Sequence, residues 1–349
     1  MMKKKKIAVL FGGCSTEYEV SLQSAYGVIT HINEEKYELF MIGIAKDSGQ
    51  WFWYDGDTNR IAKDTWEGSG ECIPVFVPTD KSVQGFCYFK DNRVHILHLD
   101  GVFPILHGKN GEDGTVQGAL SLAGIPVIGC GILSSALCMD KEAAHRTAVQ
   151  QGVPAPASCV VRKPYDKFQV QTDAKKLRYP LFVKPVRSGS SFGITLVRQE
   201  EELIPALERA FLHDSMVVME ERIEGVEVGC AVIGTETLLI GAVDEIELSE
   251  GFFDYTEKYT LKTSAIHVPA RVSEKTARQI KKTAEVLYRT LGCSGFARVD
   301  MFLTREGEIY FNEVNTIPGF TLHSRFPNMM KAVGYSFEEI VNRILEDSL

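Results

Sequence analysis

The sequence feature that most constrains the fold is an acidic β-hairpin in the C-terminal part of the chain. Two strand-like runs flank Glu306-Gly307, which we expect to form a tight two-residue hairpin loop. With that loop, Asp300 lies directly opposite Glu313, and Arg298 lies opposite Asn315. Because side chains alternate along a strand with period two, we expect all four on one face of the sheet.

The paired carboxylates of this hairpin indicate a metal site. Like charges directly opposite on neighbouring strands destabilise a sheet unless a cation lies between them. Asp300, Glu313 and Asn315 offer oxygen donors without cysteine or histidine, which suits Mg²⁺ or Mn²⁺ shared with substrate phosphates. The alternative is a solvated face on which Arg298 is the counter-ion.

Composition narrows the class of protein. A chain of 349 residues, 44% of them hydrophobic, can bury the cores of two or three domains, and its net charge of -8 argues against nucleic acid as a partner. Eight cysteines without a Cys-x-x-Cys pair favour reduced thiols. The apolar run after Lys3–Lys6 is too short for a signal peptide, and no later run reaches the length of a membrane span. We therefore expect a cytoplasmic protein without membrane contact.

The first part of the chain, to about residue 130, alternates apolar strands with helical stretches, which predicts a small α/β domain. The run Ile7–Phe11 is typical of a buried parallel strand. Ser15 or Thr16 can cap the helix that follows, and Glu17 can act there either as a cap or as the partner of an ammonium group.

Two further segments of this first part differ in what they predict. The glycine-rich loop His107–Gly114 leaves the end of a strand, the usual place for ligands in open α/β sheets. The segment 50–95 carries clustered aromatic residues but no chemistry that we can identify.

A second, smaller domain is expected to follow. Its central feature is a strand that ends at Lys184 and runs into the Gly/Ser loop Ser188–Gly193. Such a loop can cover phosphates, although this pattern alone is more often an exposed turn, and the lysine precedes the glycines, unlike a Walker A loop. The acidic run Glu220–Glu227 suits either hydrogen bonds from adenine and ribose or an exposed linker.

The last part of the chain contains a long polar and aromatic loop over residues 249–263, before the acidic hairpin. A connection of that length is usually a lid or a binding loop. Helices are expected over 273–291 and about 336–347.

In chain order the sequence presents two lysines, a Gly/Ser loop, an acidic connector and an acidic hairpin, and this order resembles the ATP-grasp superfamily. Within it, the whole chain resembles the D-alanine:D-alanine ligase family. The motifs that carry the resemblance are Phe11–Ser21, His107–Gly114, Met139–Lys141, Lys184–Gly193, Phe253–Tyr259 and Glu313–Ser324.

The resemblance implies a mixed α/β fold with a three-domain ATP-grasp architecture, in which the central and C-terminal domains are the ATP-grasp domains. The N-terminal α/β domain, 1–130, would bind the first D-alanine; the central domain, 131–225, would carry the phosphate loop; and the C-terminal domain, 226–349, would carry the lid and the magnesium site. ATP would lie between the central and C-terminal domains. The resemblance also implies a homodimer.

The resemblance further implies a two-step reaction. The carboxylate of a first D-alanine attacks the γ-phosphate of ATP, while two Mg²⁺ or Mn²⁺ ions on Asp300, Glu313 and Asn315 neutralise the charge. The amine of a second substrate then attacks the acyl phosphate. Arg298 and the backbone N–H of Gly319 stabilise the resulting oxyanion.

Other site residues follow from the same resemblance. Glu17 matches the residue that binds the first ammonium group, and with Ser190 and Tyr259 it matches a hydrogen-bonded triad. The implied ATP contacts are Lys141, Lys184, Ser190, Ser191, Glu220, Glu221, Glu227 and Lys258. The implied substrate contacts are Glu17, His107, Asp244, Phe253, Arg298, Gly319, Ser324 and Arg325.

Three positions depart from the ordinary ligases. Glu221 stands where a lysine is common, Ser188 where a glutamate is common and Arg325 where housekeeping ligases tend to have leucine. With this arginine, the chain resembles the vancomycin-resistance branch of the family, whose members make D-alanyl-D-lactate or D-alanyl-D-serine.

We expect D-serine as the second substrate. Tyr259 matches the tyrosine of peptide-forming ligases, and Arg325 can supply a polar partner for one extra hydroxyl. Alternatively, Arg325 binds only the second substrate's carboxylate or a structural acid. The alternative functions are an ordinary D-alanine:D-alanine ligase, a D-lactate ligase and a non-catalytic nucleotide-binding protein.

Overall fold

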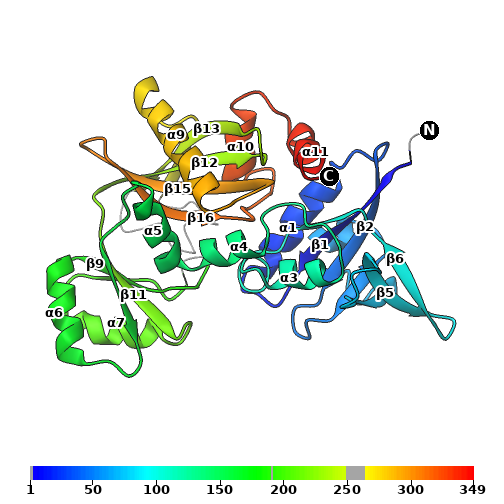
Figure 1. Ribbon diagram of the computed structural model, residues 1–349, viewed down its shortest axis with the longest axis horizontal. Coiled ribbons are helices and arrows are strands. Elements are labelled where there is room, and N and C mark those ends of the chain that lie inside the picture. Colours follow the sequence, from blue (N-terminus) through cyan, green and yellow to red (C-terminus); the bar gives the residue numbers. More distant parts are fainter. Residues whose placement is uncertain (1–2, 190–191, 249–263) are drawn as a thin grey trace.

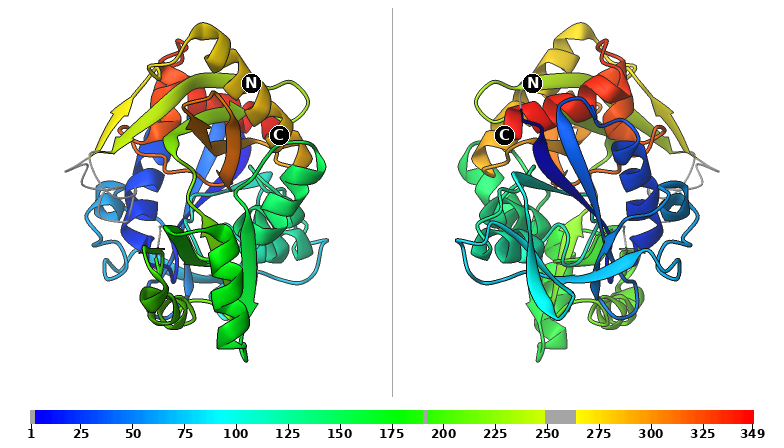
Figure 2. Two further views of the ribbon diagram at one scale, coloured as in Figure 1. Left: turned by 90° about the vertical axis from the view of Figure 1, so that its left-hand side faces the viewer. Right: turned by 90° about the vertical axis from the view of Figure 1, so that its right-hand side faces the viewer.

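The chain folds around three β-sheets that follow one another along the sequence (Figures 1 and 2). The computed structural model describes residues 3–189, 192–248 and 264–349. In Figure 1 the N-terminal sheet lies on the right, and the two smaller sheets lie on the left, one above the other. The predicted mixed α/β organisation is confirmed.

The N-terminal sheet has seven strands in the order β6-β5-β4-β3-β2-β1-β7. β1 (Lys5–Gly12) is buried and runs parallel to both neighbours, as its apolar sequence predicts. The segment 50–95 extends this sheet with antiparallel strands. The other strands are β2 (Tyr37–Ile44), β3 (Trp51–Tyr54), β4 (Cys72–Phe76), β5 (Gly85–Lys90), β6 (Arg93–His98) and β7 (Gly101–Pro104).

Helices from both ends of the chain pack together beside this sheet. The C-terminal α11 lies next to α1 (Figure 2), and Leu22 and Val28 share one buried cluster with Ile340 and Ile344. This packing ties the last helix to the first sheet. The helices of this cluster are α1 (Tyr18–Ile29), α2 (Asn59–Ala62), α10 (Arg325–Lys331) and α11 (Phe337–Ser348), whereas α3 (Thr115–Leu122) packs in a separate cluster.

The predicted cap of α1 by Ser15 or Thr16 is wrong. The N-cap position is Glu17, and its side chain makes no capping hydrogen bond. Ser15 lies two residues before Glu17, and its hydroxyl accepts the N–H of Glu17 itself.

The central sheet has four antiparallel strands in the order β10-β9-β11-β8. Asp140 caps α5 through a hydrogen bond from the N–H of Ala143, which places Lys141 in the first turn. The elements are α4 (Ile132–Met139), α5 (Lys141–Gln150), β8 (Ser158–Arg162), α6 (Lys167–Leu177), β9 (Leu181–Pro185), β10 (Thr195–Val197), the 3₁₀ helix Glu200–Glu202, α7 (Leu203–Ala210) and β11 (Met216–Glu221).

The C-terminal sheet has five antiparallel strands in the order β14-β13-β12-β15-β16. Both predicted helices of this part, α9 and α11, occur within about one residue of their expected bounds. The elements are β12 (Gly225–Ile233), β13 (Leu239–Leu248), β14 (Ser264–His267), α9 (Glu274–Thr290), β15 (Phe296–Thr304) and β16 (Ile309–Asn315). Within the described residues, no helix combines the length and the apolar character needed to cross a membrane.

Strands β15 and β16 form the predicted acidic hairpin. The register places Asp300 opposite Glu313 and Arg298 opposite Asn315, as predicted. These four polar side chains therefore lie on one face of the sheet.

The turn of this hairpin differs from the prediction. The N–H of Thr304 donates to the carbonyl of Glu308, so the loop holds three residues, 305–307, and not two. Gly307 has a φ of +88°, the left-handed conformation that three-residue hairpin loops require. A β-bulge at Asn312 then shifts the register by one residue, which offsets the longer loop. The predicted pairs are thus correct although the predicted loop is wrong.

Candidate active site

A cavity of about 540 Å³ lies between parts of all three sheet regions. Its wall includes the start of α1, the loop after β7, the α4–α5 junction, the start of the Gly/Ser loop and the segment after β16. Nine predicted site residues line it, namely Glu17, His107, Lys141, Arg298, Glu313, Asn315, Gly319, Ser324 and Arg325. Six other predicted site residues that the structure describes do not line the cavity: Lys184, Glu220, Glu221, Glu227, Asp244 and Asp300.

Five predicted site residues lie outside the described residues: Ser190, Ser191, Phe253, Lys258 and Tyr259. The predicted triad and the lid contacts therefore remain predictions.

The Glu17 carboxylate lies where two loops approach each other. A Cβ atom added to Gly108 would lie 2.6 Å from Glu17 Oε2, and one added to Gly189 would lie 3.0 Å from it. Gly108 also has a φ of +74°. Two glycines from different loops thus leave space for one carboxylate, which brings the N-terminal sheet and the Gly/Ser loop together at Glu17.

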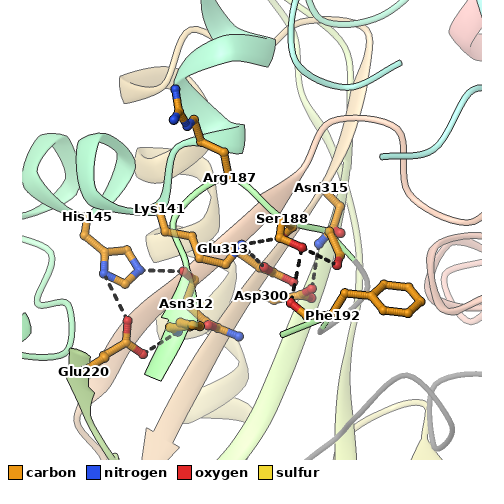
Figure 3. A network of polar contacts seen from close by, with 12 residues as sticks. Lys141, His145, Arg187, Ser188, Phe192, Glu220, Asp300, Asn312, Glu313 and Asn315 are labelled. Atoms are coloured by element: carbon orange, nitrogen blue, oxygen red, sulfur yellow. Dashed lines mark hydrogen bonds and ion pairs between the residues drawn. The ribbon is translucent and has the colours of Figure 1, made fainter. Parts of the chain in front are cut away.

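Lys141 connects the Gly/Ser loop to the acidic hairpin (Figure 3). Its Nζ donates to the carbonyl of Ser188 at 2.9 Å and lies 3.7 Å from Glu313 Oε2. The loop is anchored just before this point, because Arg187 makes a two-pronged ion pair with Asp214. A cationic group is thereby held at the cavity wall.

Asp300 is surrounded by hydrogen-bond donors. Arg298 donates from Nε to Oδ1 at 2.8 Å and from Nη2 to Oδ2 at 2.6 Å. The Asn315 amide donates to Oδ2 at 2.9 Å, and Arg325 Nη2 lies 3.3 Å from Oδ1. The Asp300 side chain is 1% exposed. Arg298 is thus the counter-ion of Asp300, as the alternative expected, but the Asp300 carboxylate is buried and does not lie on a solvated face.

The donor set still has the chemistry of a hard-ion site. Asp300, Glu313 and the amide oxygen of Asn315 lie on one face, and the Glu313 side chain is 24% exposed at the cavity. Within the described residues, no group of three or more histidine, cysteine, aspartate or glutamate side chains has the arrangement of a metal site. A divalent ion at Asp300 would share this carboxylate with the donors that already surround it.

Arg325 is held by three acidic side chains from three neighbouring strands. Its guanidinium makes a two-pronged contact with Asp244, at 2.6 and 2.9 Å, and a 3.0 Å hydrogen bond to Glu227. Asp244 is fully buried and does not line the cavity, so its implied contact with substrate is not observed in this structure. The structural-acid alternative for Arg325 is thus observed, and Arg325 also lines the cavity.

The Arg325 guanidinium lies over Gly229, where a Cβ atom would be 2.5 Å from Nη2, 2.6 Å from Asp244 Oδ1 and 2.9 Å from Asp300 Oδ1. We expect Gly229→Ala to lower the free energy of unfolding by about 1–3 kcal/mol, because this overpacking displaces the arginine. Gly118→Ala, on α3 where nothing lies within 4 Å, is the matched control and should be neutral or stabilising by up to about 1 kcal/mol. Urea denaturation of both variants tests this, and equal stabilities would contradict the close packing at Gly229.

Lys184, Glu220 and His145 form a buried polar network next to Lys141, and Figure 3 shows Glu220 and His145 in it. Lys184 Nζ donates to Glu220 Oε1 at 2.6 Å, and His145 Nε2 donates to the carbonyl of Asn312, the bulged residue, at 2.7 Å. Burial lowers the pKa of His145. Glu220 Oε2 lies 3.8 Å from His145 Nδ1 and accepts no hydrogen bond within the described residues. A donor from a ligand or from water can complete a buried acceptor of this kind.

The acidic residues after Glu220 have other partners. Glu221 accepts the backbone N–H of Ala157 at 2.7 Å, and Glu227 accepts from Arg325. In this state the acidic run therefore contributes to strand pairing and to the Arg325 site.

His107, an implied substrate contact, makes its hydrogen bonds to other parts of the protein in this structure. The ring is buried and both nitrogens have protein partners: Nδ1 lies 2.9 Å from the Ile317 carbonyl and Nε2 lies 3.2 Å from Ser24 Oγ. Burial lowers the pKa of His107, so the neutral ring predominates. Its position in a predicted ligand loop gave no sign of these long-range partners.

Sequence reasoning missed Glu112, which lines the cavity. Its carboxyl group accepts the N–H of Gly108 at 2.8 Å and the N–H of Ile317 at 3.1 Å. Desolvation, with the charge of Glu17 as a second cause, raises the pKa of Glu112 to about 8. The glycines of its loop were the only sequence signal near this residue.

The raised pKa of Glu112 predicts a pH effect on stability. A glutamate in the unfolded chain has a pKa of about 4.3. Between that pH and about 8, Glu112 keeps its proton in the folded protein but loses it in the unfolded chain. The contribution of Glu112 to stability is therefore fully present below its pKa in the unfolded chain. It is lost as the pH rises through its pKa in the folded protein. Urea denaturation at pH 5 and pH 8 should show a larger loss for wild type than for Glu112→Gln. Parallel losses would contradict the raised pKa.

Comparison with known proteins places this architecture in a class. Two family models match the chain: D-ala D-ala ligase N-terminus over residues 6–130 and D-ala D-ala ligase C-terminus over residues 149–346. The crystal structure of the VanG D-Ala:D-Ser ligase from Enterococcus faecalis has a TM-score of 0.93 and 53% identity, and the match covers 99% of this chain and 100% of that one.

Curated relatives agree over nearly the whole length. The vancomycin C-type resistance protein VanC1 of Enterococcus gallinarum is 45% identical over 343 residues, which is 98% of this chain and 97% of that protein. The D-alanine–D-alanine ligase of Caldicellulosiruptor bescii is 40% identical over 351 residues, which is 99% of this chain and 95% of that protein.

The three sheets and the cavity between them therefore have the ATP-grasp architecture of these ligases. More particularly, the chain belongs to the D-alanine–D-alanine ligase family, and vancomycin-resistance ligases are among its relatives.

Proposed function

We propose that this protein joins D-alanine to D-serine in an ATP-dependent reaction that proceeds through D-alanyl phosphate and supplies a peptidoglycan precursor in vancomycin resistance. The observation that carries the proposal is Arg325, fixed at the cavity wall by Asp244 and Glu227. The 53% identity to a D-Ala:D-Ser ligase supports the same choice.

The buried network behind the cavity fits the base of ATP. Glu220 Oε2 is a buried acceptor without a protein donor among the described residues, and an adenine amino group is a donor of the right kind. Lys184, paired with Glu220, and Lys141, at the start of the Gly/Ser loop, are proposed to contact the phosphates, together with Lys258. Magnesium, proposed to bind at Glu313, Asn315 and Asp300, would neutralise phosphate charge when bound.

The cavity residues can arrange both substrates around a developing negative charge. Glu17 is proposed to bind the ammonium group of the first D-alanine, next to Gly108 and Gly189. Arg298 and the Gly319 N–H are proposed to hold the oxyanion that forms when the second amine attacks. Both groups line the same cavity as Glu17, which is what a single reaction centre requires.

The preference for D-serine is assigned to Arg325. Its contacts with Asp244, Glu227 and Asp300 use most of its N–H groups, so its remaining surface at the cavity can meet only one small acceptor. A serine hydroxyl is such an acceptor, directly or through water. Ser324, whose hydroxyl lies 2.8 Å from Thr321 Oγ1, is proposed to contact the same substrate.

We further propose domain boundaries at residues 1–130, 131–225 and 226–349, and a homodimer. Each proposed domain contains one of the three sheets as its core. Size-exclusion chromatography with light scattering would test the dimer, and a monomer at micromolar concentration would contradict it.

Inorganic phosphate release tests the reaction class. We expect release that requires ATP, Mg²⁺ and D-alanine and rises when D-serine is added. A non-catalytic nucleotide-binding protein would bind ATP without D-amino acid-dependent release, and that result would overturn the proposed function.

A further inference from the structure

We infer that Ser24, His107 and Glu112 form a clamp that positions the Gly319 N–H for oxyanion binding. These are positioning residues, since each acts through the main chain of the segment after β16. The inference rests on the proposed ligase function. It adds that the oxyanion site is built by the N-terminal sheet region, although Gly319 belongs to the C-terminal part of the chain.

The clamp holds both polar groups of the Ile317 main chain. The Ile317 N–H donates to Glu112 Oε1 at 3.1 Å, and the Ile317 carbonyl accepts from His107 Nδ1 at 2.9 Å. The second oxygen of Glu112 accepts the N–H of Gly108, so the acid is itself fixed to the loop after β7. The peptide groups before and after Ile317 therefore cannot rotate without breaking one of these hydrogen bonds.

The clamp also holds the residue on the other side of Gly319. The Phe320 N–H donates to Ser24 Oγ at 3.1 Å, and Ser24 Oγ lies 3.2 Å from His107 Nε2. Because the Ile317 carbonyl can only accept, His107 must carry its proton on Nδ1, and Ser24 then donates to Nε2. A neutral His107 satisfies every partner in this chain of hydrogen bonds.

Gly319 lies between these two fixed points. Pro318 has no N–H, and no acceptor among the described residues takes the Gly319 N–H. Gly319 lines the cavity beside Arg298. Donors stabilise an oxyanion most when their direction is fixed before the reaction, and here the peptides on both sides supply that direction.

Two simpler explanations make different predictions. If the clamp only stabilises the fold, its loss lowers the melting temperature without a selective effect on turnover. If His107 contacts substrate directly, its replacement raises KM for D-alanine, and Ser24 has no influence. The clamp instead predicts a fall in kcat with little change in KM for ATP.

Ser24→Ala is the first test. We expect a roughly tenfold lower kcat, weaker inhibition by a phosphinate dipeptide analogue to a similar extent, and an unchanged KM for ATP. Ser21→Ala is the matched control, because Ser21 is equally buried on the same helix and its hydroxyl bonds only to Gly12 and Ile105. It should lower stability without the selective loss.

His107→Asn and His107→Gln form the second test. The asparagine amide nitrogen can replace Nδ1 and keep the hydrogen bond to Ile317, whereas the glutamine nitrogen replaces Nε2 and loses it. We therefore expect His107→Asn to retain several-fold more kcat than His107→Gln. Equal kcat values would contradict the proton arrangement.

Amide hydrogen exchange separates this inference from the proposed function. Ser24→Ala should speed exchange at Phe320 in the protein without ligands, and Ser21→Ala should not. If wild type releases no phosphate but this exchange difference is found, the clamp stands as structure and the ligase proposal fails. If wild type is an active ligase and Ser24→Ala keeps its kcat and inhibitor affinity, the positioning role is overturned.

Discussion

Replacing Glu313 with glutamine is expected to reduce ligase turnover on the order of a thousandfold while leaving the fold intact. The loss follows from the proposed metal role of this carboxylate, because metal ions contribute several kcal/mol of charge stabilisation in phosphoryl transfer. Stability should change by less than about 1 kcal/mol, since Glu313 is partly exposed and Lys141 lies 3.7 Å away.

Asp300→Asn is the informative partner of that variant. It should also lose turnover, but in addition it should lower the free energy of unfolding by about 3 kcal/mol, because it leaves Arg298 without its buried counter-charge and removes one of the three acids around Arg325. From the sequence alone, removing one of two facing carboxylates would instead relieve repulsion and preserve the fold. Urea denaturation together with phosphate release separates the two views. Wild-type turnover by either variant at moderate Mg²⁺ would refute the metal assignment.

Arg325→Leu is expected to shift the preferred second substrate from D-serine to D-alanine and to destabilise the protein by about 3–5 kcal/mol. The destabilisation arises because Asp244 is fully buried and would lose its counter-ion. The change in preference arises because leucine removes the polar partner proposed for the serine hydroxyl, and a hydroxyl buried without a hydrogen bond costs free energy that D-alanine does not incur.

A double variant separates these two effects of Arg325. Arg325→Leu combined with Asp244→Asn removes the unpaired buried charge, so stability should recover in part while the preference for D-alanine remains. Product ratios in equimolar D-alanine and D-serine measure the preference. If Arg325→Leu still made mainly D-alanyl-D-serine, Arg325 would be a purely structural residue.

Local patterns predicted the acidic hairpin well because both of its strands lie within about 20 consecutive residues. Period-two alternation and a glycine turn were enough to pair Asp300 with Glu313. The loop length was wrong, and the bulge at Asn312 that compensates for it leaves no mark in the sequence. Bulges depend on neighbouring elements, here on the carbonyl that His145 binds.

Long-range partners could not be predicted from the sequence. Arg325 and Asp244 are 81 residues apart, and His107 and Ile317 are 210 residues apart. Their pairing follows from how the sheets pack, which a single sequence does not specify. For the same reason the sequence offered Arg298 as a counter-ion of Asp300 but gave no sign of the second arginine, Arg325.

The most direct test of the account is the identity of the product. Wild-type protein incubated with ATP, Mg²⁺ and equimolar D-alanine, D-serine and D-lactate near neutral pH should form mainly D-alanyl-D-serine, as measured by mass spectrometry. Mainly D-alanyl-D-alanine would contradict the role assigned to Arg325 and indicate a housekeeping ligase, and mainly D-alanyl-D-lactate would contradict the choice of an amine as nucleophile.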